Sequence, residues 1–141
     1  MPSPGLTARV ARARRSIERL RRLASIAWEE YSADEDAQAP AERHLHILLE
    51  SILDLAAFIA ARLGLARGPT YRDVVKALID NKVVPPQLHH LALAMPGMKN
   101  ILVHGYADVR HDIIYETIRN DLDRLEELLH LLWRKAEELD P

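Results

Sequence analysis

Apolar residues recur at alternating intervals of four and three in the first and last thirds of this chain. This spacing places them along one face of an α-helix and predicts two long amphipathic helices. The first stripe comprises Leu6, Val10, Ala13, Ile17, Leu20, Ala24, Ala27 and Tyr31, and the second comprises Tyr115, Ile118, Leu122, Leu125, Leu129, Leu132 and Ala136. No segment shows the alternation that is typical of a strand. The sequence therefore predicts an all-α fold, an up-and-down bundle of about five helices.

A third long helix is expected over residues 41–63. Only Asp54 is polar between Ile52 and Ala61, so most sides of this helix should be covered by its neighbours. A polar loop over residues 32–39 should precede it. Pro40 suits the first turn of a helix, and Gly64 can cap the end.

Shorter elements are predicted between this helix and the last one. Thr70 and Asp73 resemble a capping box at the start of a helix over residues 71–80, although glutamate or glutamine is the usual partner. The pair Pro96-Gly97 should kink or break a later helix. A final helical piece is then expected over roughly residues 98–104.

Composition limits the kind of protein this chain can be. Its 141 residues suffice for one domain with a real core, and a single domain over residues 1–141 is expected, with 1–5 as a frayed leader. There is no cysteine, which excludes disulfides and thiolate zinc sites. We find neither a signal peptide nor an apolar run that should span a bilayer, so a cytoplasmic protein without membrane contact is expected.

The densest group of chemically capable side chains comprises Lys99, Asn100, His104 and Tyr106. Asn100 and His104 are four residues apart and so share one helical face, while Met98, Ile101 and Leu102 should pack inward. Histidine is a natural general acid or base, and a nearby cation can stabilise charge on a phosphate. The alternative is a helix end where histidine meets the helix dipole and tyrosine packs.

Two carboxylates on the central helix form a second candidate site. Glu50 and Asp54 are four residues apart, and His46 continues the same line. Because a buried carboxylate needs a partner, Asp54 should face a polar cluster or a cavity. The alternatives are a structural salt bridge or a subunit contact. As a metal site the trio is weak, because no second helix repeats it.

A run of arginines on the first helix lies off its apolar stripe. The net charge of −2 conceals this basic face, which contains Arg9, Arg12, Arg14, Arg15, Arg19, Arg21 and Arg22. Such a run is commonly a solvated face. It can also hold a phosphate backbone or an acidic partner protein, and Arg15, Arg19 and Arg22 are the candidate contacts. The segment lacks aromatic residues for base stacking.

The motif Lys99-Asn100-x3-His104-x-Tyr106 resembles the R-N-x3-H-x-Y signature of HepT-like toxins in the HEPN superfamily of ribonucleases. The surrounding segments agree with this resemblance, which covers about residues 6–137. Residues 43–54 resemble the second helix of the family, residues 70–78 its s-Y-r-e…L segment, and residues 114–125 its last helix.

The resemblance implies a homodimer in which two motif segments face each other across one composite cleft. RNA would be cleaved without metal or cofactor, by attack of the 2′-hydroxyl on the adjacent phosphate. On that pattern His104 is the acid–base residue, Lys99 stabilises the phosphorane and Asn100 holds the cluster in place. Glu50 and Asp54 are candidates for support of the cleft.

The resemblance also implies a partner and a way of silencing the enzyme. The partner is a cognate MntA-type nucleotidyltransferase antitoxin, which transfers AMP to the motif tyrosine, here Tyr106. Added bulk and negative charge would block the cleft. The pair would form a toxin–antitoxin system of the type VII kind.

Position 99 departs from the family pattern. Lysine is a point charge and cannot hold a phosphate bidentately as arginine does. Two hypotheses account for this lysine. Either the activity is naturally attenuated, or the substitution was engineered so that a toxic protein can be expressed. An alternative function is a catalytically weak or inactive binding partner of a nucleotidyltransferase. A third is a structural helical dimer with the basic first helix at an acidic partner surface. The dimer itself is expected from the apolar seam of the last helix, to which Leu128 and Leu131 add.

Overall fold

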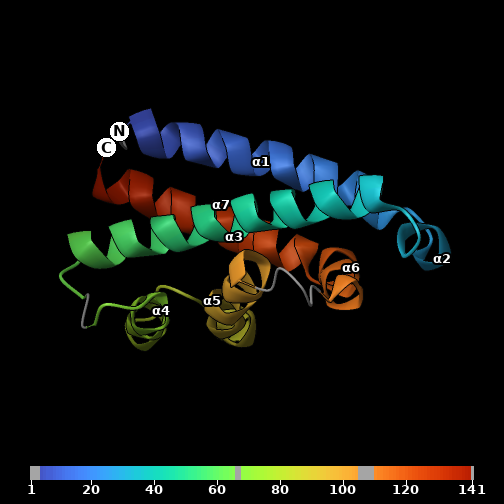
Figure 1. Cartoon of the computed structure of the whole chain (residues 1–141). Helices are drawn as coiled ribbons and strands as arrows, with labels where there is room; N and C mark the ends of the chain where they lie inside the picture. Colours follow the sequence, from blue (N-terminus) through green and yellow to red (C-terminus); the bar gives the residue numbers. More distant parts are fainter. Residues whose placement is uncertain (1–3, 66–67, 105–109, 141) are drawn as a thin grey trace.

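The computed structural model describes residues 4–65, 68–104 and 110–140, and these residues are helical without a strand. Three helices are long, and they lie alongside one another in Figure 1: α1 (Pro4–Ala24), α3 (Glu35–Arg62) and α7 (Leu122–Leu139). Four are shorter: α2 (Trp28–Tyr31), α4 (Tyr71–Asp80), α5 (His89–His104) and α6 (His111–Asn120). A 3₁₀ turn, η1 (Pro86–Leu88), precedes α5. The all-α prediction is confirmed, with seven α-helices in the described residues where about five were expected.

Three of the four shorter helices, α4, α5 and α6, form a second layer that crosses beneath the long ones (Figure 1). Helix α3 contacts both layers, since it packs against α1 and α7 and also against α4, α5 and α6. Its central position was predicted from its apolar composition. The first helix, α1, and the last, α7, bring the two ends of the chain to the same end of the bundle (Figure 1).

Helix α3 is long and apolar enough to cross a membrane, contrary to the expectation that no such run is present. The window that meets this test is 56% buried inside the protein. Its buried side chains include Leu45, Leu49, Ile52 and Ile59, all fully covered by the other helices. The apolar character of α3 is therefore accounted for by its place at the centre of the core.

The start of α3 corrects the predicted loop. The helix begins at Glu35, and Pro40 lies inside it, past the first turn. The Asp34 side chain accepts a hydrogen bond from the Asp36 amide at 2.9 Å, which caps the helix. Glu35 and Asp36 add negative charge at its positive end. This cap and the burial of Ala37 outweigh the one backbone hydrogen bond that Pro40 removes.

The apolar stripes continue across breaks in the chain that their spacing does not reveal. The first predicted helix ends at Ala24, and its last stripe residue, Tyr31, lies in the separate helix α2. The last predicted helix is divided into α6 and α7 at Asp121. A stripe records which residues face the core, and both halves of a broken helix can face the same core.

Helix α5 runs through Pro96 and Gly97, where a kink or a break was predicted, so the helix is not broken there. Ala92 and Met95, in the turn before the proline, are almost fully buried. Packing against the core therefore holds the helix together at a position where local preference opposes it. One continuous helix consequently leads from His89 to the motif.

Two predicted helix caps are confirmed. Thr70 Oγ1 accepts a hydrogen bond from the Asp73 amide at 3.1 Å, and Asp73 Oδ2 accepts one from the Thr70 amide at 3.3 Å. This capping box fixes where α4 starts, and so where Tyr71 lies. At the end of α3, Gly64 has a φ of 69°, a left-handed conformation that glycine adopts at little cost.

Two further expectations need correction. Pro4 and Gly5, placed in a frayed leader, are the first residues of α1. Leu128 does not widen an exposed seam, because it is fully buried inside the single chain, and Leu131 is half-buried against the same core. The last helix therefore gives no apolar reason of its own for a dimer.

Candidate active site

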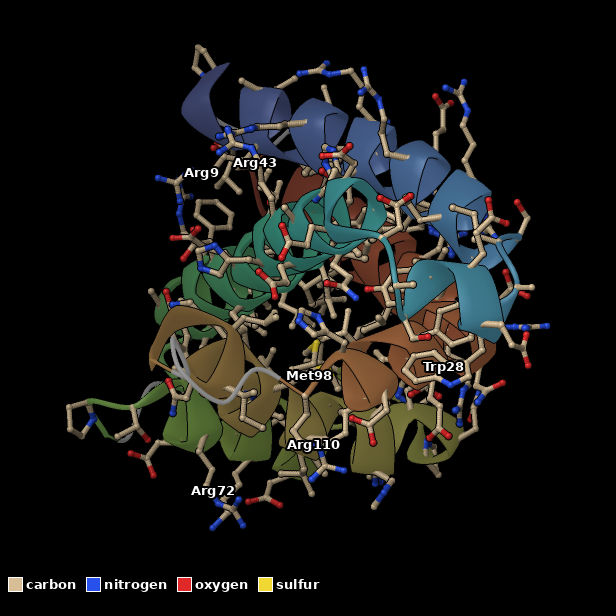
Figure 2. The ribbon with its side chains drawn as sticks, turned by 45° about the vertical axis from the view of Figure 1, so that its right-hand side comes forward. Arg9, Trp28, Arg43, Arg72, Met98 and Arg110 are labelled. Carbon is tan, nitrogen blue, oxygen red and sulfur yellow. The ribbon has the colours of Figure 1, made fainter. Side chains whose placement is uncertain are left out.

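The motif lies on the C-terminal half of α5, which ends at His104. Because the helix is unbroken here, positions 100 and 104 lie on one face, as predicted. Met98 points into the bundle (Figure 2), and it and Leu102 pack against the core. Ile101 does not pack inward as expected, since 43% of it is exposed. The side chain of His104 and all of Tyr106 lie outside the described residues, so their contacts stay predictions.

Lys99 is half-buried and lies over an aromatic ring. Its Nζ atom is 4.8 Å from the centroid of the Tyr71 ring, within the range of a cation–π contact. Tyr71 is the first residue of α4. Two helices that a loop and η1 separate in sequence are thus joined at the motif cation.

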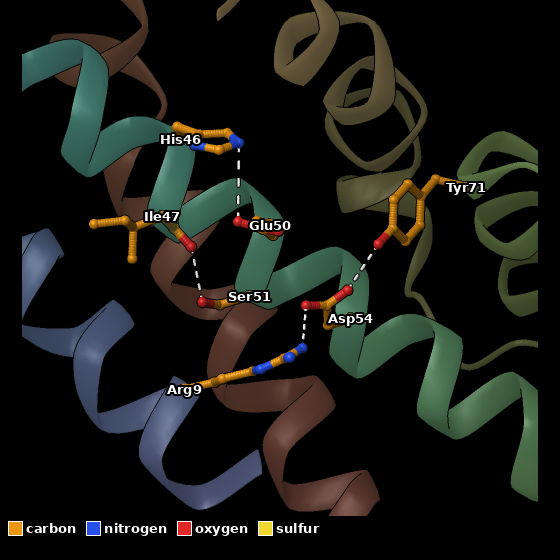
Figure 3. Close-up of polar contacts among 7 residues, drawn as sticks. All are labelled: Arg9, His46, Ile47, Glu50, Ser51, Asp54 and Tyr71. Carbon is orange, nitrogen blue, oxygen red and sulfur yellow. Dashed lines mark hydrogen bonds and ion pairs between the residues drawn. The ribbon is translucent and has the colours of Figure 1, made fainter. Parts of the chain in front are cut away.

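The hydroxyl of Tyr71 extends this contact to α3. It donates a hydrogen bond to Asp54 Oδ1 at 2.7 Å (Figure 3). Burial, and then this hydrogen bond, raise the pKa of Tyr71 to about 12, so the phenol stays protonated and donates. The other carboxylate oxygen of Asp54 accepts a hydrogen bond from Arg9 on α1. We call Arg9, Asp54, Tyr71 and Lys99 the Tyr71 network.

The two predicted carboxylates therefore have different surroundings. Asp54 joins the Tyr71 network and fulfils the expectation that it faces a polar cluster. Glu50 is exposed, and its Oε2 lies 3.8 Å from His46 Nε2 on the same helix (Figure 3). Within the described residues, the basic group near the Glu50 carboxylate therefore belongs to its own helix, α3. Among the described residues, no group of three histidine, aspartate or glutamate side chains is arranged to hold a metal.

Asn100 opens onto a groove between the start of α4 and α5. The groove has a volume of about 730 Å³. Its lining joins motif and network residues and comprises Pro69, Thr70, Tyr71, Arg72, Leu93, Ala94, Pro96, Gly97 and Asn100. A smaller groove of about 220 Å³ between α1 and α3 is lined by Arg9, Arg12, Ile47, Glu50, Ser51 and Asp54. The Tyr71 network thus contributes residues to two hollows on this part of the surface.

The arginines of α1 divide into two groups. Arg9 pairs with Asp54, and Arg21 pairs with Asp123 and Glu126 on α7, at 2.7 Å and 2.6 Å. The other five are exposed and have no acidic partner within the described residues: Arg12, Arg14, Arg15, Arg19 and Arg22. The basic face predicted from the sequence is therefore present, although two of its members are neutralised within the chain.

His44 lies beside this basic face. Its Nδ1 atom is 3.0 Å from the hydroxyl of Ser16 on α1. Burial, followed by the charges of Arg19, Arg43 and Arg12, lowers the pKa of His44. Burial is the larger cause, and the neighbouring arginines add to it because they disfavour a further positive charge on the α1–α3 edge.

Sequence reasoning missed Tyr71 and Arg9 as partners of the site. Asp54 was identified because it is the one polar residue in an apolar stretch, but the sequence does not indicate which residues meet it. Tyr71 immediately follows a residue that caps a helix, so its position in space is well defined. A tyrosine fixed by a capping box is the signal in the sequence that could have pointed to Tyr71.

The chain is thus an all-α bundle whose motif begins near the end of one continuous helix. The chain matches the HepT-like family, described as ribonuclease HepT-like, over residues 13–132, and it belongs to that family.

Two relatives share low but extended similarity with the chain. The mRNA nuclease HepT of Shewanella oneidensis is 24% identical over 129 residues, covering 92% of this chain and 95% of the relative. The tRNA nuclease HepT of Aphanizomenon flos-aquae is 22% identical over 104 residues, covering 74% of this chain and 71% of the relative. The similarity thus extends over most of each protein.

Solved structures share the fold. A tri-AMPylated Shewanella oneidensis HEPN toxin in complex with MNT antitoxin has a TM-score of 0.81 at 21% identity, covering 94% of this chain and 98% of that one. A mutant form of a MntA–HpeT toxin–antitoxin, in which alanine replaces a tyrosine, has a TM-score of 0.80 at 22% identity, with 92% and 98% covered. The arrangement of helices is therefore that of a HEPN toxin.

Proposed function

We propose that this protein is the toxin of a toxin–antitoxin pair and acts as a metal-independent endoribonuclease. The observation that carries the proposal is the family match over residues 13–132, with the motif at the end of α5 inside it. The two relatives named as nucleases support an RNA substrate. A cytoplasmic location goes with this function.

The motif residues suit cleavage by the neighbouring 2′-hydroxyl. A neutral His104 would accept the proton of that hydroxyl as its oxygen bonds to phosphorus. The P–O5′ bond then breaks, and a protonated histidine gives a proton to the departing oxygen. Lys99 would stabilise the added negative charge on the phosphorane, and Asn100 would orient the cluster.

A homodimer with one composite cleft is part of the proposal. Ile101 is exposed on the motif helix, and Ile47 on α3 is only half-buried. Burial of these apolar groups by a second copy would bring two motif segments together. Sedimentation of the purified chain tests this step, and a monomer at micromolar concentration would remove the composite cleft.

The grooves and the basic face suggest where RNA would lie. Arg72 also lines the groove at Asn100, and its exposed side chain projects from the surface in Figure 2, where the guanidinium can pair with phosphate. Arg15, Arg19 and Arg22 remain candidates for contacts to RNA or to the antitoxin. Their exposure and lack of acidic partners in the described part of the chain support that role.

A nucleotidyltransferase antitoxin of the MntA type is the proposed partner, and transfer of AMP to Tyr106 the proposed means of silencing. The similar toxin is tri-AMPylated and in complex with MNT antitoxin. Intact mass after co-expression with an MntA-type nucleotidyltransferase tests this step. A gain of one or more AMP units that Tyr106→Phe abolishes is expected, whereas a gain that this variant keeps would assign the modification elsewhere.

RNA cleavage in the presence of a chelator tests the enzyme directly. We expect the wild-type chain to cut RNA in EDTA and to leave 2′,3′-cyclic phosphate ends. A substrate with 2′-deoxyribose at the cleavage position should resist, because the attacking hydroxyl is missing. Cleavage of that substrate at the normal rate would contradict the proposed chemistry.

Lys99 supports one alternative, a catalytically weak or inactive partner of the nucleotidyltransferase. Lysine offers phosphate a single charge where arginine offers a fork of donors. This alternative predicts a stable complex with the antitoxin and no RNA cleavage, even after Lys99→Arg. Equal cleavage by the lysine and arginine forms would instead show that the exchange at position 99 is without consequence.

A further inference from the structure

We propose that Tyr71 is a positioning residue that holds the Lys99 ammonium group for the reaction, and that Asp54 and Arg9 hold Tyr71. This inference rests on the proposed function, because it assigns a task to a residue of the nuclease motif. It follows from the contacts that link α1, α3, α4 and α5 in the Tyr71 network.

The ring of Tyr71 is fixed at both ends. Its backbone is held at the first position of α4 by the capping box between Thr70 and Asp73. Its hydroxyl is held by Asp54 on the central helix at 2.7 Å. A ring secured in this way presents one face to Lys99 at a constant place, so the Lys99 side chain loses part of its freedom before RNA binds.

The network leaves the charge of Lys99 available. Asp54 is the negatively charged member of the network, but one of its oxygens accepts from Arg9 and the other from Tyr71. No acidic side chain lies within salt-bridge distance of Lys99 in the described residues. A cation held by a ring and not by a carboxylate keeps its full charge for a phosphate.

This arrangement should matter more for lysine than for the arginine of the family pattern. A lysine side chain is flexible and offers one point charge, so its effect on a phosphorane depends on where that charge is held. An arginine at this position would be held in place by two hydrogen bonds to the phosphate. The lysine is held in place by the ring of Tyr71 instead. The side chains of Lys99 and Tyr71 should therefore act as a unit.

Lysine methyl groups provide a test that needs no enzyme activity. The chain has four lysines: Lys76, Lys82, Lys99 and Lys135. After reductive methylation with ¹³C-formaldehyde, each lysine is expected to give a methyl signal, and Lys99→Arg assigns one of them to Lys99. That signal should lie upfield of the other three because the Tyr71 ring shields it.

Two variants separate the ring from the hydroxyl. Tyr71→Phe keeps the ring and should keep the upfield position of the Lys99 signal, while Tyr71→Leu should return it to the position of the other lysines. If Tyr71→Leu does not fold, the wild type and Tyr71→Phe still decide the matter. A Lys99 signal that coincides with the other three in both of these proteins would overturn the proposal.

Cleavage rates then show whether the contact matters to the reaction. Tyr71→Leu should lower kcat about tenfold, the size of a well-shielded cation–π contact, with little change in KM, and Tyr71→Phe should restore most of it. On a Lys99→Met background, Tyr71→Leu should cost nothing further. An equal loss on both backgrounds would assign Tyr71 a purely structural role.

The methyl-signal experiment and the cleavage assay test different claims, and either can fail without the other. A shielded Lys99 signal in a chain that cuts no RNA would refute the proposed nuclease function and leave the contact standing. A nuclease whose Lys99 signal is unshielded would refute the positioning role and leave the function standing.

Discussion

Two tyrosines in different parts of the bundle, Tyr31 in α2 and Tyr71 in α4, have in common a pKa raised to about 12. Burial is the largest cause for each. Tyr31 is completely covered, and its hydroxyl has no hydrogen-bond partner among the described residues. Tyr71 is only half-buried, and its hydroxyl donates to Asp54.

The surroundings of the two rings differ in kind. Tyr31 packs in an aromatic cluster, 4.8 Å from the ring centroid of Tyr115 and 6.1 Å from that of Trp28. Trp28 and Arg9 lie on opposite sides of the molecule in Figure 2. A shifted pKa alone therefore does not mark a functional residue. What distinguishes Tyr71 is a set of partners that leads to the motif cation.

The largest effect is expected at alkaline pH, where the buried hydroxyl of Tyr31 ionises. Since the pKa of Tyr31 is about 12 when folded and near 10 when unfolded, its contribution is complete below pH 10 and is lost as pH rises through 12. The loss attributable to Tyr31 should reach about 2–3 kcal/mol. Urea unfolding between pH 9 and 12 measures it. In Tyr31→Phe this part of the pH dependence should disappear, and its persistence would contradict the assignment.

Removal of the carboxylate in the Tyr71 network should cost nearly as much. Asp54→Ala leaves a guanidinium and a phenol without their acceptor, so the free energy of unfolding should fall by about 2 kcal/mol. Chemical denaturation provides the measurement. Asp123→Ala is the matched control, since Asp123 also pairs with an arginine of α1 but its side chain is 85% exposed. Equal losses in the two variants would show that the burial of Asp54 is unimportant.

The fold could be predicted largely because apolar spacing reports which residues face a core. Helix α3 was recognised as central since Asp54 interrupts an otherwise apolar stretch, and the capping box fixed the start of α4. The breaks at residues 25–27 and at Asp121 were missed because the stripes continue across them. Of the kink or break predicted at Pro96, the break is absent because the packing of α5 opposes the local preference of proline.

The candidate site was only partly predictable. The motif fixed Lys99 and Asn100 on one helix, and Asp54 was expected to need a partner. Spacing within a helix cannot show which side chains arrive from other helices, so Arg9 and Tyr71 were not identified. The same limit explains the error at Leu128, whose burial depends on contacts with helices far away in sequence.

Tyr31→Phe should stabilise the protein at neutral pH, in contrast to changes in the Tyr71 network. The substitution keeps the packed ring and removes a buried hydroxyl that lacks a partner in the described residues. A gain of about 1 kcal/mol is expected. Thermal unfolding at pH 7 measures it, with Tyr71→Phe as the matched control, which should lose stability. A loss in both variants would mean that the Tyr31 hydroxyl has an acceptor after all.

Arg21→Ala should have the smallest effect. Arg21 joins α1 to α7 through two ion pairs, but these lie at the surface, where screening and side-chain entropy cancel most of the gain. We expect a loss of about 0.5 kcal/mol and an unchanged rate of RNA cleavage. Denaturant unfolding and a cleavage assay check both statements. A clear fall in rate would add Arg21 to the candidate RNA contacts on α1.

The rate of RNA cleavage by His104→Ala, compared with the wild type in EDTA, tests the central claim most directly. We predict that the wild-type chain cleaves and that the variant does not, while its helical content and sedimentation stay the same. The loss should be at least about a hundredfold, as is typical when a general acid or base is removed. Undiminished cleavage by His104→Ala would contradict the assignment of the motif as the catalytic centre.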